Sequence, residues 1–189
     1  MPIESNEAAV RFDPSGRLTG PVTHQTRTLG QLQGVFADES ARSQMPQDTV
    51  VYRVDAYMPV EEGVDGGLFF GTSFLEPGVV GDEYFMTRGH FHQHRDAGEM
   101  YWGISGEGCL VLMDESGESR VEIVRPGSLH YVPGRTAHRL ANTGSKSLVV
   151  GACWPSDAGH DYDSLVPDGF TALVKCVDGE PTVIDRDDG

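Results

Sequence analysis

A chain of 189 residues is long enough to bury a core within one domain, and its 24 glycines and 11 prolines favour short strands and turns over long helices. The formal net charge of −15 argues against a nucleic-acid partner, because phosphate backbones recruit lysine and arginine. The N-terminal residues lack the basic and apolar stretches of a secretory signal, and no apolar run reaches the roughly 20 residues that span a bilayer. We therefore expect a cytoplasmic protein with no membrane partner and with its three cysteines reduced.

In chain order, residues 1–30 are expected to form an extended arm with some strand character, and residues 31–45 a helix. Beyond them, short apolar or alternating runs bounded by Gly, Pro, Asn or Asp predict a series of strands. Residues 99–118 are expected to form a hairpin, residues 156–172 an irregular segment and residues 170–185 a closing hairpin. The predicted single domain divides into an arm with a short helix (1–48), a metal-binding β-barrel (49–155) and a C-terminal segment (156–189).

Four residues in the predicted barrel are candidates for holding a metal ion. His90 and His92 are two positions apart, so on a strand both imidazoles point to the same face. Glu99 begins the next strand-like run, and His138 follows a Pro-Gly turn. Three neutral imidazoles and one carboxylate form a mixed nitrogen and oxygen site that leaves positions for water or substrate. We expect one divalent ion per subunit, with Fe(II) preferred and Mn(II), Ni(II) or Zn(II) as alternatives.

The arrangement of these residues resembles the two sequence motifs of the cupin family. The motif positions are His90, His92, Glu99 and Gly106 in the first motif, and Gly127, Pro133, His138 and Asn142 in the second. Two features depart from the common pattern: six residues separate His92 from Glu99, where three or four are usual, and Arg135 stands at a glycine position. The resemblance implies an all-β cupin fold, a double-stranded β-helix or jelly-roll barrel, with extra N-terminal strands and a short helix.

More narrowly, the chain is similar to the cupin-type glucose-6-phosphate isomerases, best known from archaea, from about residue 36 to residue 170. The similar pieces are VVY at 50–52, TRGHFH at 87–92, the widely spaced Glu99 with Tyr101, YVPG and AHR within 131–139, and PSDAGHDY at 155–162. The last piece is not a general cupin feature and discriminates best. The resemblance implies reversible interconversion of glucose 6-phosphate and fructose 6-phosphate, a step of glycolysis, in a homodimer formed through N-terminal strands.

The same resemblance implies roles for individual residues. Glu99, Tyr101 and His160 are the candidates for catalysis. The expected sugar-phosphate pocket consists of Tyr52, Thr72, Thr87, Arg88, Gly89 and Tyr162. Arg88 replaces the more familiar lysine, which keeps the positive charge and adds a planar fork of donors. Trp154 stands where relatives often have a tyrosine, so a hydroxyl that could bind phosphate is absent there.

Aldose–ketose isomerisation has two chemical routes. One removes the C2 proton through an enediol and needs a base and charge stabilisation at the oxygens. The other transfers hydride directly while the metal polarises the carbonyl. Glu99 is the candidate base, and Tyr101 could donate a hydrogen bond to O1 or O2. Solvent deuterium in the product would support the enediol route.

Two other functions fit the same ligand set: a non-catalytic sugar- or metal-binding cupin and an iron-dependent cupin oxygenase. The DAGHDY segment and residues 87–89 favour the isomerase, because both suit a phosphorylated polar ligand.

We expect the remaining histidines to have no part in the site, with His94 in an exposed turn, His130 packed on a strand and His24 in the polar arm.

Overall fold

The computed structural model describes residues 6–165 and 169–186 as a barrel of antiparallel strands with a short α-helix. Residues 1–5 and 187–189 of the predicted arm and C-terminal segment lie outside the described residues, as do residues 166–168 of the segment expected to be irregular. The first elements are β1 (Arg11–Phe12), β2 (Leu18–Thr19), β3 (Thr23–Thr28), the 3-10 helix η1 (Leu29–Leu32), α1 (Glu39–Gln44), β4 (Val50–Tyr57), β5 (Leu68–Leu75), β6 (Val79–Val80) and β7 (Glu83–Tyr84). The later elements are β8 (Glu99–Ser105), β9 (Gly108–Asp114), β10 (Ser119–Val124), β11 (Leu129–Val132), β12 (Thr136–Asn142), β13 (Leu148–Pro155), the 3-10 helix η2 (Asp163–Leu165), β14 (Ala172–Val177) and β15 (Glu180–Asp185).

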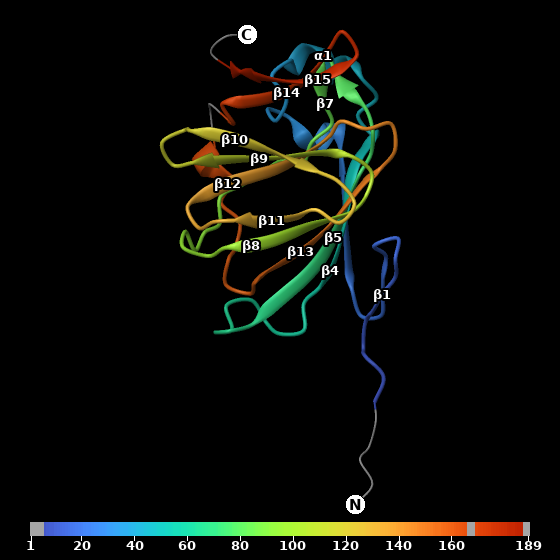
Figure 1. Ribbon diagram of the computed structural model, residues 1–189, viewed down its shortest axis with the longest axis vertical. Helices are drawn as coiled ribbons and strands as arrows, with labels where there is room; N and C mark the ends of the chain where they lie inside the picture. The colour runs from blue at the N-terminus through green and yellow to red at the C-terminus, as the bar shows by residue number, and fades with distance from the viewer. Residues whose placement is uncertain (1–5, 166–168, 187–189) are drawn as a thin grey trace, which may run out of the picture.

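Two sheets form the walls of the barrel. One has six strands in the order β11-β8-β13-β5-β4-β3, and the other has three in the order β10-β9-β12. In Figure 1 the three-stranded sheet lies above β11, β8 and β13, while a four-stranded sheet in the order β15-β14-β7-β6 and helix α1 cover one end. The all-β jelly-roll barrel predicted from the sequence, with extra N-terminal strands and a short helix, is confirmed.

The core between the walls is built on β9. Its sequence GCLVLM is buried at every position from Gly108 to Met113, because β9 lies in the middle of its sheet and is covered on both faces. The same apolar cluster includes Leu140 of β12 and Val150 of β13, so it joins the two walls. Burial of these side chains, each worth roughly 1.5–3 kcal/mol, keeps the two sheets together.

The predicted hairpin over residues 99–118 is wrong, although both of its strands exist. β8 pairs with β11 and β13, whereas β9 pairs with β10 and β12, so the two consecutive strands belong to different sheets. Gly106, at φ +78°, adopts the left-handed conformation in the turn that carries the chain from one sheet to the other. The apolar pattern identified the strands but not their partners, which lie far away in the sequence.

The helix predicted over residues 31–45 is interrupted. The structure has η1, then an irregular stretch in which Gly34 takes φ +76°, and only then α1. Phe36 of this stretch is buried against Phe85, with ring centroids 6.4 Å apart. Asp38 then caps α1 by accepting a hydrogen bond from the backbone of Ala41. Burial of an aromatic ring and a new N-cap therefore override helix continuity here.

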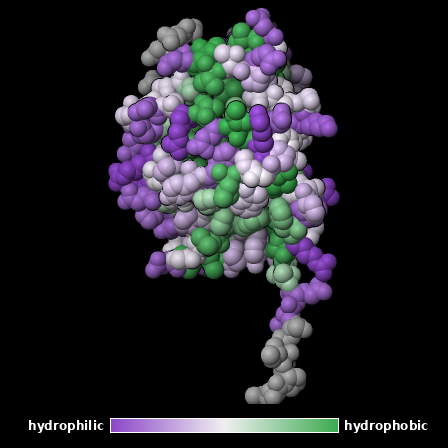
Figure 2. Space-filling model, in the orientation of Figure 1, coloured by the Kyte–Doolittle hydropathy of each residue, from purple (hydrophilic) through white to green (hydrophobic). Residues whose placement is uncertain are grey.

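The edge strand of the six-stranded sheet in the N-terminal third is β3, whose sequence is THQTRT. The resemblance implies a dimer formed through N-terminal strands, and the edge that β3 offers for it is polar. Elsewhere, apolar side chains reach the surface between hydrophilic ones on the face shown in Figure 2. In the described parts of the chain, no helix is long and apolar enough to cross a membrane.

Candidate active site

A pocket of about 350 Å³ lies against the inner face of the six-stranded sheet. Because side chains alternate along a strand, every second residue of each neighbouring strand contributes to it. The contributing residues are Thr23, Gln25 and Arg27 of β3, Tyr52, Val54 and Ala56 of β4, Phe69, Gly71 and Ser73 of β5, Ala152 and Trp154 of β13, and Glu99 and Tyr101 of β8. The register places them opposite one another, as in the pairs Arg27–Tyr52 and Val54–Ser73.

Three histidines and Glu99 converge at one place in this pocket. His90 and His138 face each other across an isolated antiparallel bridge, and His92 follows two residues after His90. The metal-ligating atoms of these three histidines all lie within 4.8 Å of one another. Oε2 of Glu99 lies 3.3 Å from Nε2 of His92 and 3.1 Å from Nε2 of His138. The predicted ligand set is thus brought together by segments that are distant in the sequence.

The imidazole rings are oriented from behind by backbone carbonyls. Nδ1 of His92 donates to the carbonyl of Ala97 at 2.9 Å, and Nδ1 of His138 lies 3.3 Å from the carbonyl of Thr136. Both contacts favour the tautomer that leaves the Nε2 lone pair facing the cluster. Nε2 of His138 is buried and has no hydrogen-bond partner among the described residues, although Oε2 of Glu99 lies 3.1 Å away. A cation between these atoms would satisfy it.

Glu99 and Tyr101 lie two residues apart on β8 and face the same side of the sheet. Burial alone would raise the pKa of the Glu99 carboxyl, but the neighbouring imidazoles of His138 and His92 hold the pKa below its ordinary value. Burial and the nearby Glu99 carboxylate raise the pKa of Tyr101 well above its usual value. Tyr101 therefore keeps its proton at neutral pH and is available as a hydrogen-bond donor.

His160 and Tyr162 reach the pocket from the irregular segment after β13. The ring of His160 lies 4.4 Å from that of His90, and it stacks on Tyr162 with centroids 5.9 Å apart and planes inclined by 10°. The centroid of Tyr162 is itself 5.7 Å from that of His90. The structure thus places both residues beside the histidine cluster, as the sequence predicted.

One end of the pocket is positively charged. Arg88 lies with its guanidinium carbon 4.4 Å above the Tyr162 ring, and Arg27 projects into the same pocket from β3. Neither arginine has a carboxylate within ion-pair distance among the residues that the structure describes. Burial raises the pKa of Tyr52, which is close enough to Arg27 and Arg88 for their charges to oppose that shift. Unpaired guanidinium groups next to hydroxyls suit an anionic ligand.

Thr87 and Gly89 complete this end. The Thr87 hydroxyl accepts a hydrogen bond from the backbone of Leu140 at 3.0 Å, which leaves its own proton free to donate. Gly89 has φ +74° and lines the pocket. A Cβ atom there would lie 2.6 Å from the Phe170 ring and 3.0 Å from Cβ of Arg139. Only glycine fits this close approach without displacing its neighbours.

Thr72 is the predicted pocket residue that the structure does not bring to the site. Its neighbours Gly71 and Ser73 line the pocket, so the alternation of the strand directs Thr72 to the other face. There its methyl group lies near Gly16 of the N-terminal arm, and the residue is completely buried. The expectation of a substrate contact by Thr72 is therefore corrected: it packs between the sheet and the arm.

Sequence reasoning missed Arg27 and did not place Trp154. Arg27 belongs to a polar strand with no motif, and only its register opposite Tyr52 shows that it faces the pocket. Trp154 lies in the pocket wall edge-on to Phe69, with centroids 6.1 Å apart. An indole therefore forms part of the pocket wall at this position.

The remaining histidines lie apart from the metal-ligating cluster. His130 is buried, with Nδ1 2.7 Å from Glu122 and Nε2 2.8 Å from the Ser128 hydroxyl. His94 is exposed and contacts Asp157, and His24 is exposed and pairs with Asp55. These placements agree with their expected absence from the site.

Comparison with known proteins shows one consistent family. The family model described as "Glucose-6-phosphate isomerase (GPI)" matches residues 26–187. A glucose-6-phosphate isomerase of Thermococcus kodakarensis is 43% identical over 161 residues, which is 85% of this chain and 84% of that protein. The enzymes of the same name from Pyrococcus furiosus and Sinorhizobium medicae are each 38% identical, over 85% and 88% of this chain and 85% and 78% of their own lengths.

Among solved structures, oxalate decarboxylase from Bacillus subtilis at pH 4.6 is 21% identical, with a TM-score of 0.46. The alignment covers 62% of this chain but only 28% of the decarboxylase.

Replacement of Gly89 by alanine should destabilise the protein more than the same change at a glycine with free space around it. Gly34 is a matched control, because it has a similar φ of +76° and nothing within 4 Å of the new Cβ. We expect Gly34→Ala to cost about 1–2 kcal/mol of backbone strain. Gly89→Ala should cost about 1–3 kcal/mol more through its clash with Phe170. The free energies of unfolding in urea test this, and equal losses for the two variants would contradict the packing argument.

Proposed function

The chain belongs to the glucose-6-phosphate isomerase family, and on this premise we propose that the pocket of its barrel is where the sugar phosphate is bound and isomerised. The function is the interconversion of glucose 6-phosphate and fructose 6-phosphate, a step of glycolysis. The observation that supports this pocket is that it combines a cluster of metal-ligating groups with a positively charged end. The reacting C1 and C2 and the phosphate of one substrate molecule need these two environments at a short distance from each other.

In this proposal His90, His92, His138 and Glu99 hold one divalent ion. The convergence of their ligating atoms and the buried, unpartnered Nε2 of His138 fit such an ion. When bound, the ion acts as a Lewis acid towards the oxygens of the substrate. The carbonyls behind His92 and His138 keep the ligand lone pairs directed inward, so the site is organised before the ion arrives.

Tyr101 and Glu99 are the residues we propose for the chemical step. Tyr101 keeps its phenolic proton, for the reasons given above, and can donate it in a hydrogen bond to O1 or O2. Both close contacts of Glu99 with the histidines are made by Oε2. Oε1 is then the atom that would accept and return a proton between C1 and C2, with His160 as a further polar group facing the sugar.

The opposite end of the pocket is proposed to anchor the phosphate. Arg27 and Arg88 provide charge without competing carboxylates, and Thr87 and Tyr52 provide hydroxyl groups. Gly89 lines this end of the pocket, and its lack of a Cβ lets the segment pack against Phe170 on the other side. Tyr162 lies between the two ends, because it stacks on Arg88 and on His160. Charge-assisted hydrogen bonds to phosphate are strong enough to hold the sugar in one orientation.

Fe(II) as the ion is a further proposal, supported by the family resemblance and by the mixed ligand set. A homodimer and a cytoplasmic location are also proposed, on the basis of the family resemblance. Three imidazoles and a carboxylate suit Fe(II) but also accept Mn(II), Ni(II) or Zn(II). The polar edge of β3 would then pair through backbone hydrogen bonds rather than through apolar contact.

Purified protein should convert fructose 6-phosphate to glucose 6-phosphate in an assay coupled to glucose-6-phosphate dehydrogenase. Extended treatment with a chelator should abolish turnover, and a divalent ion should restore it.

Tyr101→Phe should lower kcat by roughly 10²–10³ while the metal content stays the same, because it removes one hydrogen-bond donor aimed at the reacting oxygens. His24→Ala is the control, because His24 of β3 lies on the outer face of the sheet beside Asp55, and this change should leave kcat unchanged. Turnover that survives complete removal of metal, or Tyr101→Phe with full activity, would contradict the proposed roles.

Removal of either guanidinium group at the positively charged end of the pocket should weaken substrate binding. Arg27→Met and Arg88→Met should each raise KM by about 10-fold to 100-fold, since a charged hydrogen bond is worth roughly 1.5–3 kcal/mol. Arg53→Met is the matched control, because Arg53 is next to Tyr52 in the sequence but pairs with Asp55 and lies over Phe74. Steady-state kinetics at fixed ionic strength measure these effects. An equal rise of KM in all three variants would mean that the net charge of the protein causes the effect, and would contradict direct phosphate contacts by Arg27 and Arg88.

A further inference from the structure

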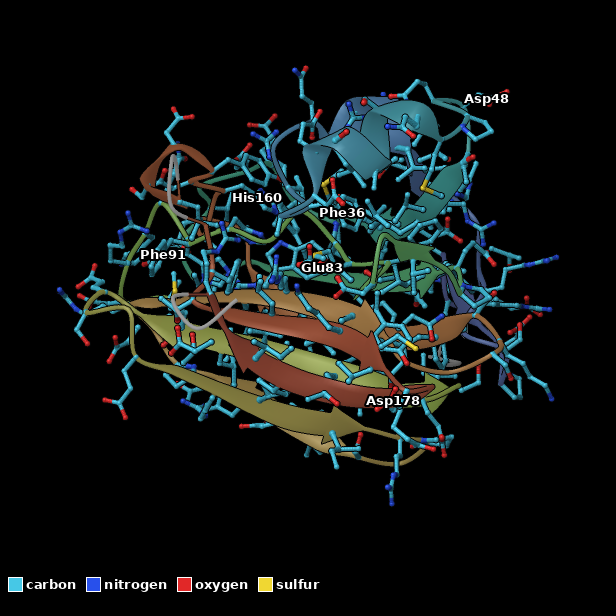
Figure 3. All side chains as sticks on the ribbon, turned by 90° about the horizontal axis from the view of Figure 1, so that it is seen from above. Phe36, Asp48, Glu83, Phe91, His160 and Asp178 are labelled. Carbon is cyan, nitrogen blue, oxygen red and sulfur yellow. The ribbon has the colours of Figure 1, made fainter. Side chains whose placement is uncertain are left out.

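The two aromatic side chains beside the histidine cluster are carried by a segment with little regular structure of its own. His160 and Tyr162 lie between the end of β13 and η2, and the residue between them is Asp161. In the view of Figure 3, His160 and Phe91 lie on the same side of the molecule. The position of the segment must therefore come from its contacts with the metal-binding segment that includes Phe91.

Backbone hydrogen bonds provide part of this attachment. Asp161 and Phe91 form an isolated antiparallel bridge, with N–O distances of 3.1 and 2.8 Å. The backbone N–H of His94 also donates to the carbonyl of Ala158 at 3.0 Å. Phe91 lies between the ligands His90 and His92, so the bridge joins the metal-binding segment directly to the residue between His160 and Tyr162.

Arg95 provides the rest, because its side chain contacts both segments at once. Nη2 lies 2.5 Å from Oδ2 of Asp161 and donates to the hydroxyl of Ser164 at 2.8 Å. Nη1 donates to the backbone carbonyl of His92 at 3.1 Å, and the guanidinium lies 4.6 Å from the centroid of Phe91. One planar group thus contacts four neighbours in these two segments, and its Nε also lies 3.6 Å from Glu115 in the turn after β9, unlike an isolated surface ion pair.

Asp161 is held on its other side as well. Its Oδ1 accepts hydrogen bonds from the backbone of Asp163 and of Ser164, both at 3.1 Å, and its Oδ2 accepts one from the Ser164 hydroxyl at 2.6 Å. The side chains of Arg95 and Asp161 are only 27% and 22% exposed, so solvent screens the pair incompletely. Asp161 therefore connects Arg95 to the start of η2 and fixes the backbone on both sides of the segment.

We propose that Arg95 is a positioning residue that locks the segment of His160 and Tyr162 onto the metal-binding segment, so that both rings face the bound sugar. The inference rests on the proposed function of the pocket, and it adds a residue that does not touch the substrate. Loss of Arg95 removes the side-chain contacts with Asp161 and Ser164, while the backbone bridge between Phe91 and Asp161 remains. The metal ligands stay in place, but the rings of His160 and Tyr162 are no longer held in one orientation.

Arg95→Met should lower kcat/KM by between about 10-fold and 100-fold, because small displacements of groups that orient a substrate have effects of this size. Metal content per chain should equal that of the wild type. Arg95→Lys, which keeps the charge but loses the fork, should recover part of the loss. Arg135→Met is the matched control: Arg135 pairs with Asp96 and shares Glu115 with Arg95, but its ion pairs do not involve the 157–165 segment. It should have wild-type kinetics.

A double-mutant cycle separates positioning from general stability. If Arg95 acts through His160, then His160→Ala should cost much less in the Arg95→Met background than in the wild type. Wild-type kinetics for Arg95→Met would overturn the proposal, as would fully additive losses or a loss of kcat/KM that follows loss of metal. Failure of the proposed function is a separate result, because it appears as an inactive wild-type protein before any variant is compared.

Discussion

The structure depends on how it accommodates a buried carboxylate. Glu99 is 6% exposed and lies inside the barrel, where an unpaired charge would be strongly unfavourable. Its Oε2 is within 3.3 Å of the Nε2 atoms of two imidazoles, so a cation bound between these groups would offset its charge. For this arrangement His92, from the segment between β7 and β8, and His138, from β12, must meet beside Glu99. Backbone carbonyls behind the two rings orient them. The barrel, the bridge between His90 and His138 and the loop from His92 to Glu99 all serve this convergence.

The two faces of the six-stranded sheet have different roles. The inner face carries alternate residues that form one wall of the pocket, while His138 of β12 and the segment with Arg88, His90 and His92 close it from the other side. The outer face is covered by the N-terminal arm and carries Asp55 with its partners Arg53 and His24. Because neighbours in sequence point to opposite faces, Tyr52 and Arg53 have unrelated surroundings. The histidine cluster and the positively charged end therefore line one pocket between these parts of the fold, which suits a small substrate with two functional groups such as a sugar phosphate.

The sequence predicted most of the site, since residues with distinctive chemistry stand at motif positions. His90, His92, Glu99 and His138 converge as expected, and Tyr101, His160 and Tyr162 lie beside them. What it missed depends on register and on tertiary contact. Thr72 was assigned to the pocket although its strand directs it outward, and Arg27 was overlooked because only its pairing with Tyr52 reveals its direction. The hairpin over 99–118 failed for the same reason: alternation identifies a strand but not the sheet that it joins. Arg95 belongs to an apparent turn, and its contacts exist only in the folded chain.

The claim at the centre of this account is that the four converging side chains hold a metal ion. Elemental analysis of the purified protein measures this directly, with His138→Ala as the test variant and His24→Ala as the control. Circular dichroism of each variant shows whether the barrel is retained. We expect about one divalent ion per chain in the wild type and in His24→Ala, and almost none in folded His138→Ala. Wild-type protein that is free of metal yet fully active, or folded His138→Ala with its full complement of metal, would contradict it.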